Sequence, residues 1–370
     1  MEIFFTNIDY KIMGTSFPGV PFFMDSNYQL IDDINEFFSR YILVDGRINS
    51  PKTWKSYAYW LLDFLKWTIA NNLNWKYLTI SDIVVYRNWS IETCSLTPST
   101  VNLRIGVLKR FYQYAFENNL VNHNPIKSIE TKFYVDKHSD FLSHSHKLTL
   151  TRNLLSVKTH SELPKFYSDV DLVKIFNVVH SDRLRLMMRL MLECGLRRQE
   201  VAELPLVTIE ETIKIAQKIG PSSEILLKLP AYICKGNKSR SVIISYPTVM
   251  RLMQYRATVR PKLEKKFKSL NKKIPINFWL THLGTEYKPE SLSIEISLLG
   301  KKAGVEKATP HKFRHTFATN LFALTNDLRL VQKLLGHSHI HTTTIYEHTA
   351  ANDRLGLLAD YQNNLNNLLK

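Results

Sequence analysis

Apolar residues recur at helical spacing along most of the chain, but between residues 223 and 245 the spacing changes to that of strands. Ile225-Leu-Leu-Lys-Leu229 and Ser241-Val-Ile-Ile-Ser245 flank the segment Lys235-Gly-Asn-Lys-Ser239. Short apolar runs on either side of a Gly-Asn pair are typical of a β-hairpin. We therefore expect a mainly α-helical protein that contains a small antiparallel β-sheet.

The charge of the chain indicates a polyanionic partner. The 370 residues include 49 lysines and arginines against 33 aspartates and glutamates, a formal net charge of +16. A membrane surface is the competing partner, but no segment reaches the roughly 18 apolar residues of a spanning helix, and no signal peptide opens the chain. The three cysteines are scattered and odd in number, which predicts reduced thiols. We expect a cytoplasmic protein that binds DNA and no membrane.

Residues 27–127 have the pattern of a compact helical domain. One helix is expected to start at Ser50-Pro51 and another at Thr97-Pro98, because proline is favoured in the first turn of a helix. The second helix carries basic residues on the side opposite its apolar face. The candidates for DNA contacts come from these helices and from the hairpin: Lys55, Arg104, Lys109, Arg110, Lys238 and Arg240.

The rest of the chain divides where its composition changes. Residues 1–26 are broken by glycine and proline, and we expect an N-terminal extension without regular structure. Residues 128–163 are expected to form an extended linker, whose four histidines lack the cysteines and spacing of a zinc site. Residues 164–351 form a second predicted domain, and residues 352–370 a C-terminal tail with leucines at loose helical spacing. The basic run at 256–273 is either a DNA-facing helix end or a solvated face.

Two arginines on segments far apart in sequence have the chemistry needed to hold a phosphate. Arg197 follows a Gly195-Leu196 turn, and Arg314 lies in His311-Lys-Phe-Arg314-His315. The planar guanidinium donates two parallel hydrogen bonds and keeps its charge, so it suits the non-bridging oxygens of a phosphate. A surface role would explain either arginine alone. Together they can clamp one phosphate, and losing such a donor typically lowers a rate by about 10²–10³.

The chain also supplies a nucleophile and groups that could move its proton. Tyr346 lies nine residues after His337. A tyrosine hydroxyl has an ordinary pKa of about 10, so it must lose its proton as it attacks. His311, His315 and His337 offer imidazoles for that transfer. Lys235 at the hairpin tip could protonate a leaving oxygen, although a hairpin lysine is usually only solvated.

These segments resemble the boxes of the tyrosine recombinase (phage integrase) family, and they occur in the family's order. In chain order they are Gly195-Leu-Arg197-Arg-Gln-Glu200-Val201, Lys235-Gly-Asn-Lys-Ser-Arg240, His311-Lys-Phe-Arg314-His315, and Leu335-Gly-His337 followed by Tyr346.

The resemblance assigns the catalytic roles and implies a fold. It implies a helical core-binding domain and an α+β catalytic domain, which form a C-shaped clamp around DNA. The tyrosine would attack a scissile phosphate, form a 3′-phosphotyrosyl link and release a 5′ hydroxyl, with neither metal nor another cofactor. The implied catalytic residues are Tyr346, Arg197, Lys235, His311, Arg314 and His337, supported by Glu200 and His315.

The implied partners are double-stranded DNA with specific recombination sites and further copies of the chain in a tetrameric synapse. An accessory recombinase or excision factor could take part. The setting would be the nucleoid, for integration, excision or transposition of a mobile element or for resolution of DNA dimers. We expect residues 352–370 to dock onto a neighbouring subunit, with packing in cis as the alternative.

Other functions are weighed against this one. A type IB topoisomerase-like or telomere-resolving enzyme would share the phosphotyrosine chemistry, but the order and spacing of the boxes fit the recombinases better. A non-catalytic DNA-binding regulator on the same scaffold would lack a catalytic group, and none is missing. The chain departs from the family pattern in its longer 128–163 linker and between Glu200 and Lys235, where we expect an added helix or loop near 208–220.

Overall fold

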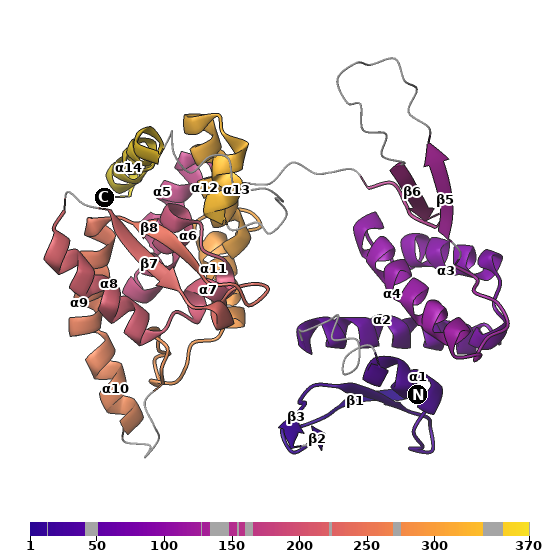
Figure 1. The fold of residues 1–370 in the computed structure, drawn as a ribbon. Coiled ribbons are helices and arrows are strands. Elements are labelled where there is room, and N and C mark those ends of the chain that lie inside the picture. Colours follow the sequence, from indigo (N-terminus) through magenta and orange to yellow (C-terminus); the bar gives the residue numbers. More distant parts are fainter. Residues whose placement is uncertain are drawn as a thin grey trace. The chain divides into compact units, whose positions relative to one another are not determined.

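Two units of the chain, Met1–Ser161 and Glu162–Lys370, each have a hydrophobic core of their own (Figure 1). The computed structural model describes residues 1–12, 14–40, 51–126, 128–133, 148–153, 155–159, 166–221, 224–268, 275–335 and 351–369.

Helices make up most of the regular secondary structure in the described part of the first unit. They are α1 (Asp32–Ser39), α2 (Pro51–Ala70), α3 (Ile80–Glu92) and α4 (Pro98–Glu117). The helix starts predicted at Pro51 and Pro98 are confirmed. Thr97 caps α4, since its hydroxyl accepts a hydrogen bond from the backbone N–H of Thr100 at 3.3 Å. Aromatic rings fill the space between these helices. Phe64 of α2, for example, meets Tyr86 of α3 edge to face at 5.0 Å.

Two pairs of antiparallel strands lie in the N-terminal segment, and one of them contributes to the core of the first unit. The pairs are β1 (Glu2–Phe5) with β4 (Pro21–Met24) and β2 (Lys11–Ile12) with β3 (Thr15–Ser16). Phe23 of β4 is fully buried and its ring stacks on that of Phe38 at 5.6 Å. The expectation that residues 1–26 lack regular structure is therefore wrong. Pro21 fits a strand because it is the first residue of an edge strand, where its missing N–H leaves no partner unsatisfied.

A further pair of strands lies within the segment expected to be a linker. They are β5 (Ser128–Phe133) and β6 (Leu148–Asn153), paired antiparallel. After β6, Leu155 is buried in the core of the first unit. The side-chain amide of Asn102 on α4 bonds both backbone groups of Val157, at 2.9 and 2.8 Å. The chain therefore stays attached to the first unit until about residue 157.

The second unit is mainly helical and contains one small described sheet. Its elements are α5 (Asp169–Val178), α6 (Asp182–Cys194), α7 (Arg198–Ala202), α8 (Leu206–Ile219), β7 (Ile225–Leu229), β8 (Arg240–Ile244), α9 (Tyr246–Thr258), α10 (Arg260–Lys268), α11 (Pro289–Lys302), α12 (Pro310–Thr325), α13 (Leu328–Leu335) and α14 (Ala351–Leu368). The predicted hairpin is confirmed, with Leu229 opposite Arg240, and so is a helix near 208–220, which is α8. The mainly helical fold with small antiparallel sheets is likewise confirmed.

Helix α6 lies at the centre of this unit and is buried almost throughout. Two of its charged side chains, Arg189 and Glu193, are also buried, and they fix the start of α9. Glu193 accepts hydrogen bonds from the backbone N–H of Ser245 and the hydroxyl of Thr248, both at 2.6 Å. Arg189 donates to the same hydroxyl at 2.8 Å. Because a buried charge is costly unless paired, this cluster allows little movement at the end of β8.

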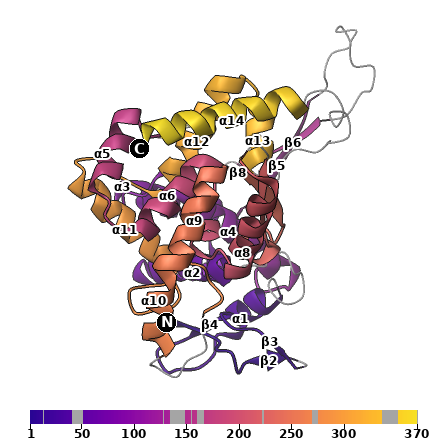
Figure 2. The ribbon, with the colours of Figure 1, turned by 90° about the vertical axis from the view of Figure 1, so that its left-hand side faces the viewer.

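Helix α14 packs in cis, beside α12 (Figures 1 and 2). Leu358, Tyr361, Leu365 and Leu369 are all buried in the core of the second unit. The Tyr361 hydroxyl donates to the carbonyl of Leu192 on α6 at 2.7 Å. In the single chain, therefore, these apolar side chains pack against their own unit. Such packing in cis was the alternative considered for residues 352–370.

Candidate active site

The turn that carries Arg197 depends on a glycine in close contact with two other elements. Helix α6 ends at Gly195, whose φ of 61° and ψ of 30° lie in the left-handed region. A Cβ at this position would lie 2.5 Å from the ring of Phe317 and 3.1 Å from the side chain of Leu335. The glycine lets the chain leave α6 sharply and places Arg197 at the N-cap of α7.

Glu200 holds this turn together from inside the protein. Its side chain is fully buried, and its two oxygens accept from the backbone N–H of Arg197 at 2.7 Å and from Arg197 Nη1 at 2.8 Å. Arg240 of β8 donates to the same carboxylate at 2.7 and 3.2 Å. Burial raises the pKa of the Glu200 carboxyl, but the bonds and charges of Arg240 and Arg197 outweigh it, so this pKa lies below its usual value. The carboxylate is thus ionised and braces both arginines.

Arg314 joins three elements of the site. It lies on α12, is 4% exposed, and donates to the backbone carbonyl of Gly195 and to that of Leu335 at 2.6 Å. Burial lowers the pKa of its guanidinium to about 9, and the positive charges of Arg197 and Arg240 act in the same direction. Several cations are therefore held close together around one carboxylate. An anion entering this region would offset their repulsion.

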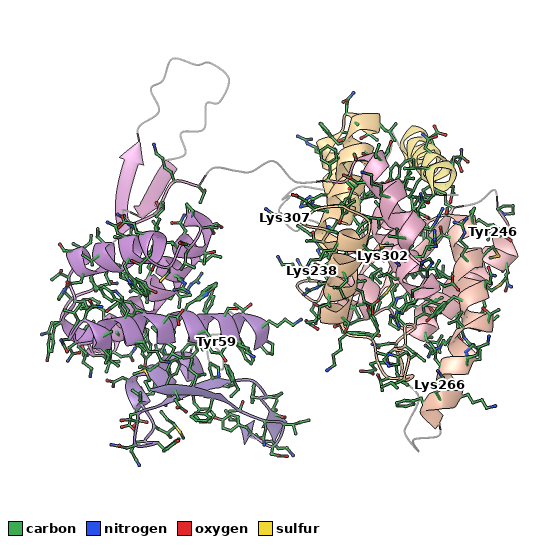
Figure 3. The ribbon with its side chains drawn as sticks, turned by 180° about the vertical axis from the view of Figure 1, so that it is seen from behind. Tyr59, Lys238, Tyr246, Lys266, Lys302 and Lys307 are labelled. Atoms are coloured by element: carbon green, nitrogen blue, oxygen red, sulfur yellow. The ribbon has the colours of Figure 1, made fainter. Side chains whose placement is uncertain are left out.

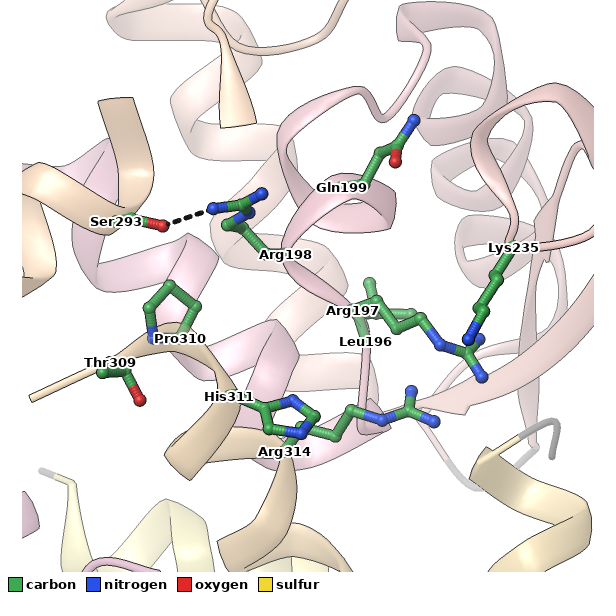
Figure 4. Close-up of a pocket in the computed structure, with 10 residues that line it drawn as sticks. All are labelled: Leu196, Arg197, Arg198, Gln199, Lys235, Ser293, Thr309, Pro310, His311 and Arg314. Atoms are coloured by element: carbon green, nitrogen blue, oxygen red, sulfur yellow. Dashed lines mark hydrogen bonds between the residues drawn. The ribbon is translucent and has the colours of Figure 1, made fainter. Parts of the chain in front are cut away.

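A cleft of about 460 Å³ brings together residues from the first three sequence boxes. Arg197, Lys235, His311 and Arg314 all line it, and in Figure 4 the two guanidinium groups and the lysine amine point into the same region. His311 lies in the first turn of α12, where the positive end of the helix dipole also favours an anion. The cleft therefore has the size and charge to accept a phosphate group.

The two described histidines of the third box lie one turn apart on α12. The rings of His311 and His315 meet edge to face at 4.2 Å. Burial, followed by the nearby charge of Arg314, lowers the pKa of His315 below its ordinary value. The neutral form of the His315 imidazole, which contacts His311, is therefore favoured. Lys235 is exposed, in a turn closed by a 3.2 Å hydrogen bond from the N–H of Asn237 to the carbonyl of Cys234.

Two predicted catalytic residues, His337 and Tyr346, lie outside the described residues. The described part of the chain ends at Leu335, where α13 ends, and resumes at Ala351 with α14.

Two of the predicted DNA-contacting arginines are engaged in ion pairs. Arg104 of α4 is 13% exposed, and its Nη2 lies 2.9 Å from a carboxylate oxygen of Asp63 on α2. Arg240 is 12% exposed and pairs with Glu200 at 2.7 Å. Both guanidiniums are therefore paired with a carboxylate of the protein, which points to roles in holding the structure.

The other candidates for DNA contacts are more accessible. Lys55 is exposed on α2, and Lys109 is half-buried on α4. Arg110 is exposed and donates to the Tyr57 hydroxyl at 2.6 Å. Lys238 is exposed in the loop before β8.

The cleft is also lined by residues that were not predicted, among them Arg198, Ser293 and Thr309. Arg198 and Ser293 form one end, where the arginine donates to the serine hydroxyl at 2.9 Å (Figure 4). Thr309 caps α12, and its hydroxyl accepts from the N–H of Lys312 at 3.4 Å. The Thr309-Pro310 pair is a readable helix-start signal. Ser293 has no such signal, because it reaches the cleft only through the packing of α11 beside α7.

Comparison with known proteins identifies the family. The sequence pattern of the phage integrase family matches residues 162–353. The chain belongs to this family. The pattern described as "Phage integrase, N-terminal SAM-like domain" matches residues 34–119 in the first unit.

Similar proteins extend over most of the chain. The tyrosine recombinase XerD of Rickettsia bellii is 28% identical over 324 residues, which cover 86% of this chain and 95% of the relative. The tyrosine recombinase XerC of Listeria monocytogenes serotype 4b is 26% identical over 307 residues, covering 81% and 87%. The chain is a site-specific tyrosine recombinase, and the alternatives considered from the sequence are not favoured.

Solved structures have the same fold. The Tn1549 transposon integrase, residues 82–397 in complex with circular intermediate DNA, is 17% identical and gives a TM-score of 0.54, covering 84% of this chain and 95% of that one. Lambda integrase, residues 75–356 bound to DNA, is 16% identical with a TM-score of 0.53, covering 85% of this chain and 95% of that one.

Among the residues that the structure describes, none of the helices combines the length and the hydrophobicity needed to span a membrane.

Proposed function

We propose that this recombinase cuts and rejoins DNA strands through a covalent 3′-phosphotyrosyl intermediate formed by Tyr346. The observation that supports the proposal is the cleft lined jointly by Arg197, Lys235, His311 and Arg314. These side chains come from segments far apart in the sequence, yet they face one space of a size that suits a phosphate. Surface arginines and lysines without a shared ligand would have no reason to converge in this way.

The proposed reaction exchanges one phosphodiester for another. The Tyr346 oxygen attacks the scissile phosphorus, the bond from phosphorus to the 5′ oxygen breaks, and the phosphate is now ester-linked to tyrosine. The tyrosine proton passes to His311, and Lys235 gives a proton to the leaving 5′ oxygen. A 5′ hydroxyl of a partner strand then reverses the step. Since one ester replaces another of similar energy, no ATP is consumed.

The arginines would act on the barrier of this reaction. Charge grows on the non-bridging oxygens in the transition state, and Arg197 and Arg314 are held by Glu200 and by backbone carbonyls before substrate arrives. Donors that are already in place need no reorganisation during the reaction, and each contributes a factor of about 10²–10³. We assign His337 to the same phosphate. Arginine, lysine and histidine thus supply the positive charge that a metal ion provides in other phosphoryl-transfer enzymes.

The proposed substrate is double-stranded DNA with specific sites, contacted by residues of both units. Lys238 and Lys307 project from one edge of the second unit (Figure 3), and both are close in sequence to residues that line the cleft. Lys55, Lys109 and Arg110 would contact phosphates from the first unit. Each neutralised phosphate should contribute about −0.9 to the slope of log K against log salt concentration.

We further propose a tetrameric synapse in which residues 352–370 are exchanged between subunits. The apolar seat that α14 occupies in cis would then receive the same helix from a neighbour, as in domain swapping. Deleting residues 352–370 should abolish synapsis and leave cleavage of a single site intact. If the deletion unfolds the second unit, the helix belongs to its own core. A partner recombinase or an excision factor would bind in the same assembly.

The proposed biological setting is cytoplasmic DNA at the nucleoid. The reaction would serve movement of a mobile element by integration, excision or transposition, or the resolution of DNA dimers.

The test is a nicked duplex suicide substrate made from DNA that flanks the gene. The wild-type protein should form an SDS-resistant adduct in the presence of EDTA, and Tyr346→Phe should form none. Tyr232→Phe is the matched control, because Tyr232 is 61% exposed on the same unit and has no proposed role. An adduct that survives Tyr346→Phe would show that another residue is the nucleophile. If no variant forms an adduct although all bind the DNA, the regulator function replaces this proposal.

A further inference from the structure

Arg240 is held entirely from within the protein, at a place where a DNA-contacting residue was expected. It is the first residue of β8, five residues after Lys235, and its side chain is 12% exposed. Two of its nitrogens grip Glu200, with Nη2 at 2.7 Å and Nε at 3.2 Å from the carboxylate oxygens. The third, Nη1, donates to the backbone carbonyl of Leu334 at 2.8 Å. All three nitrogens of the guanidinium therefore have protein partners.

The bond to Glu200 controls Arg197. The fully buried carboxylate is shared between the two guanidiniums, with Arg240 on one side and the backbone and side chain of Arg197 on the other. If Arg240 were removed, the Glu200 carboxylate would interact with Arg197 alone. The Arg197 guanidinium, which lines the cleft, would then be drawn toward the carboxylate and away from a bound phosphate.

The bond to Leu334 ties the same arginine to the end of α13. The last carbonyls of a helix have no partner within the helix and carry its negative partial charge, so a guanidinium is a favoured cap. Arg240 caps Leu334, and Arg314 caps the next carbonyl, that of Leu335. Arg240 thus links three parts of the catalytic unit: the hairpin that carries Lys235, the box around Arg197, and the end of α13.

We infer that Arg240 is a positioning residue for the strand-cleavage reaction and does not contact DNA. It sets the direction of Arg197 through Glu200 and fixes the end of α13 relative to the lysine hairpin. The inference rests on the proposed function, since it concerns the reaction carried out in that cleft.

Salt dependence separates positioning from DNA contact. A residue that neutralises a phosphate contributes about −0.9 to the slope of log K against log salt concentration, and its loss removes that contribution. A positioning residue leaves the slope unchanged. Its loss appears instead in the rate at saturating protein, because a displacement of about 1 Å in a reacting group can lower a rate by about 10²-fold.

The experiment compares Arg240→Gln and Arg240→Lys with wild type on the nicked suicide substrate. Lys238→Gln is the matched control, two residues earlier in the loop before β8 and with an exposed side chain. We expect Arg240→Gln to keep the wild-type salt slope and to cleave about 10²-fold more slowly at saturation. Arg240→Lys should recover part of the rate, since it restores the charge without the fork. Lys238→Gln should reduce the magnitude of the slope by about 0.9.

A second arm tests whether Arg240 acts through Glu200. The rate losses of Arg240→Gln and Glu200→Gln should fall short of adding in the double variant, because both break one link. A fall of about 0.9 in the slope magnitude with an unchanged saturated rate for Arg240→Gln would overturn the inference. So would full additivity. If Arg240→Gln does not fold, Arg240→Lys carries both arms. Failure of the wild type to form an adduct would instead reject the proposed function.

Discussion

Replacing Gly195 with alanine should destabilise the second unit by about 2–4 kcal/mol. A left-handed backbone costs alanine roughly 1–2 kcal/mol. Its Cβ would lie 2.5 Å from the ring of Phe317, which is 2% exposed and packs against Tyr361, so the ring has no space to move into. Forced repacking of this kind costs about 1–3 kcal/mol. Alanine also reduces the conformational freedom of the unfolded chain, which offsets about 0.4–1 kcal/mol of the destabilisation. Urea unfolding followed by circular dichroism measures the sum.

Gly304→Ala is the matched control for this change. Gly304 also has a positive φ, 68°, just after a helix of the same unit, but a Cβ there would meet nothing within 4 Å. It should lose only the backbone cost, about 1 kcal/mol. Cleavage should suffer only in Gly195→Ala, because the Gly195 carbonyl accepts a hydrogen bond from Arg314. Equal loss of stability in the two variants would refute the packing argument.

Three further predictions concern single side chains. Tyr361→Phe removes the bond to the Leu192 carbonyl and should cost about 1–2 kcal/mol in urea unfolding; an unchanged midpoint would mean that α14 leaves its cis seat in solution. Because the pKa of the Glu200 carboxyl is lowered on folding, the ionised carboxylate stabilises the folded state above the unfolded pKa of 4.5. This stabilisation is lost as the pH falls through the pKa of the folded state. Glu200→Gln should therefore lose less stability than wild type on acidification from about pH 6 to about pH 3, and a parallel pH dependence would contradict this. The pKa of His315 is lowered from 6.5, so below that pH the unfolded chain binds a proton first and stability falls. His315→Gln should flatten this part of the curve, as thermal melts at several pH values would show.

Local signals made much of the fold predictable. Thr97-Pro98 and Ser168 mark helix starts because their hydroxyls accept bonds from N–H groups only three residues ahead. The hairpin was equally predictable from local sequence, because the strand-like spacing of its apolar residues and its turn residues lie within one short segment. The strands of residues 1–26 were missed, because β1 and β4 are brought together by the burial of Phe23 among the helices. The glycines and prolines in the connecting turns indicated irregular structure, so the local sequence did not predict that β1 pairs with β4.

The candidate site was predictable as a set of residue types, and its internal order was not. The boxes identified Arg197, Lys235, His311 and Arg314, and the structure gathers these in one cleft. The role of Arg240 was hidden, since its partners lie 40 and 94 residues away and nothing in its neighbours distinguishes it from an exposed lysine such as Lys238. Which cations face the ligand and which brace the others depends on tertiary contacts.

The distances along the chain between bonded groups set an order of assembly during synthesis. The core of the first unit is complete once Leu155 has been made. The cleft requires Arg314 to reach Gly195, 119 residues earlier, and the second core closes only when Tyr361 reaches Leu192, 169 residues earlier. Domains generally fold as units during synthesis. On the proposed function, a growing chain acquires its basic DNA-facing helices well before it acquires the means to cut, so unfinished chains can hold DNA without breaking it.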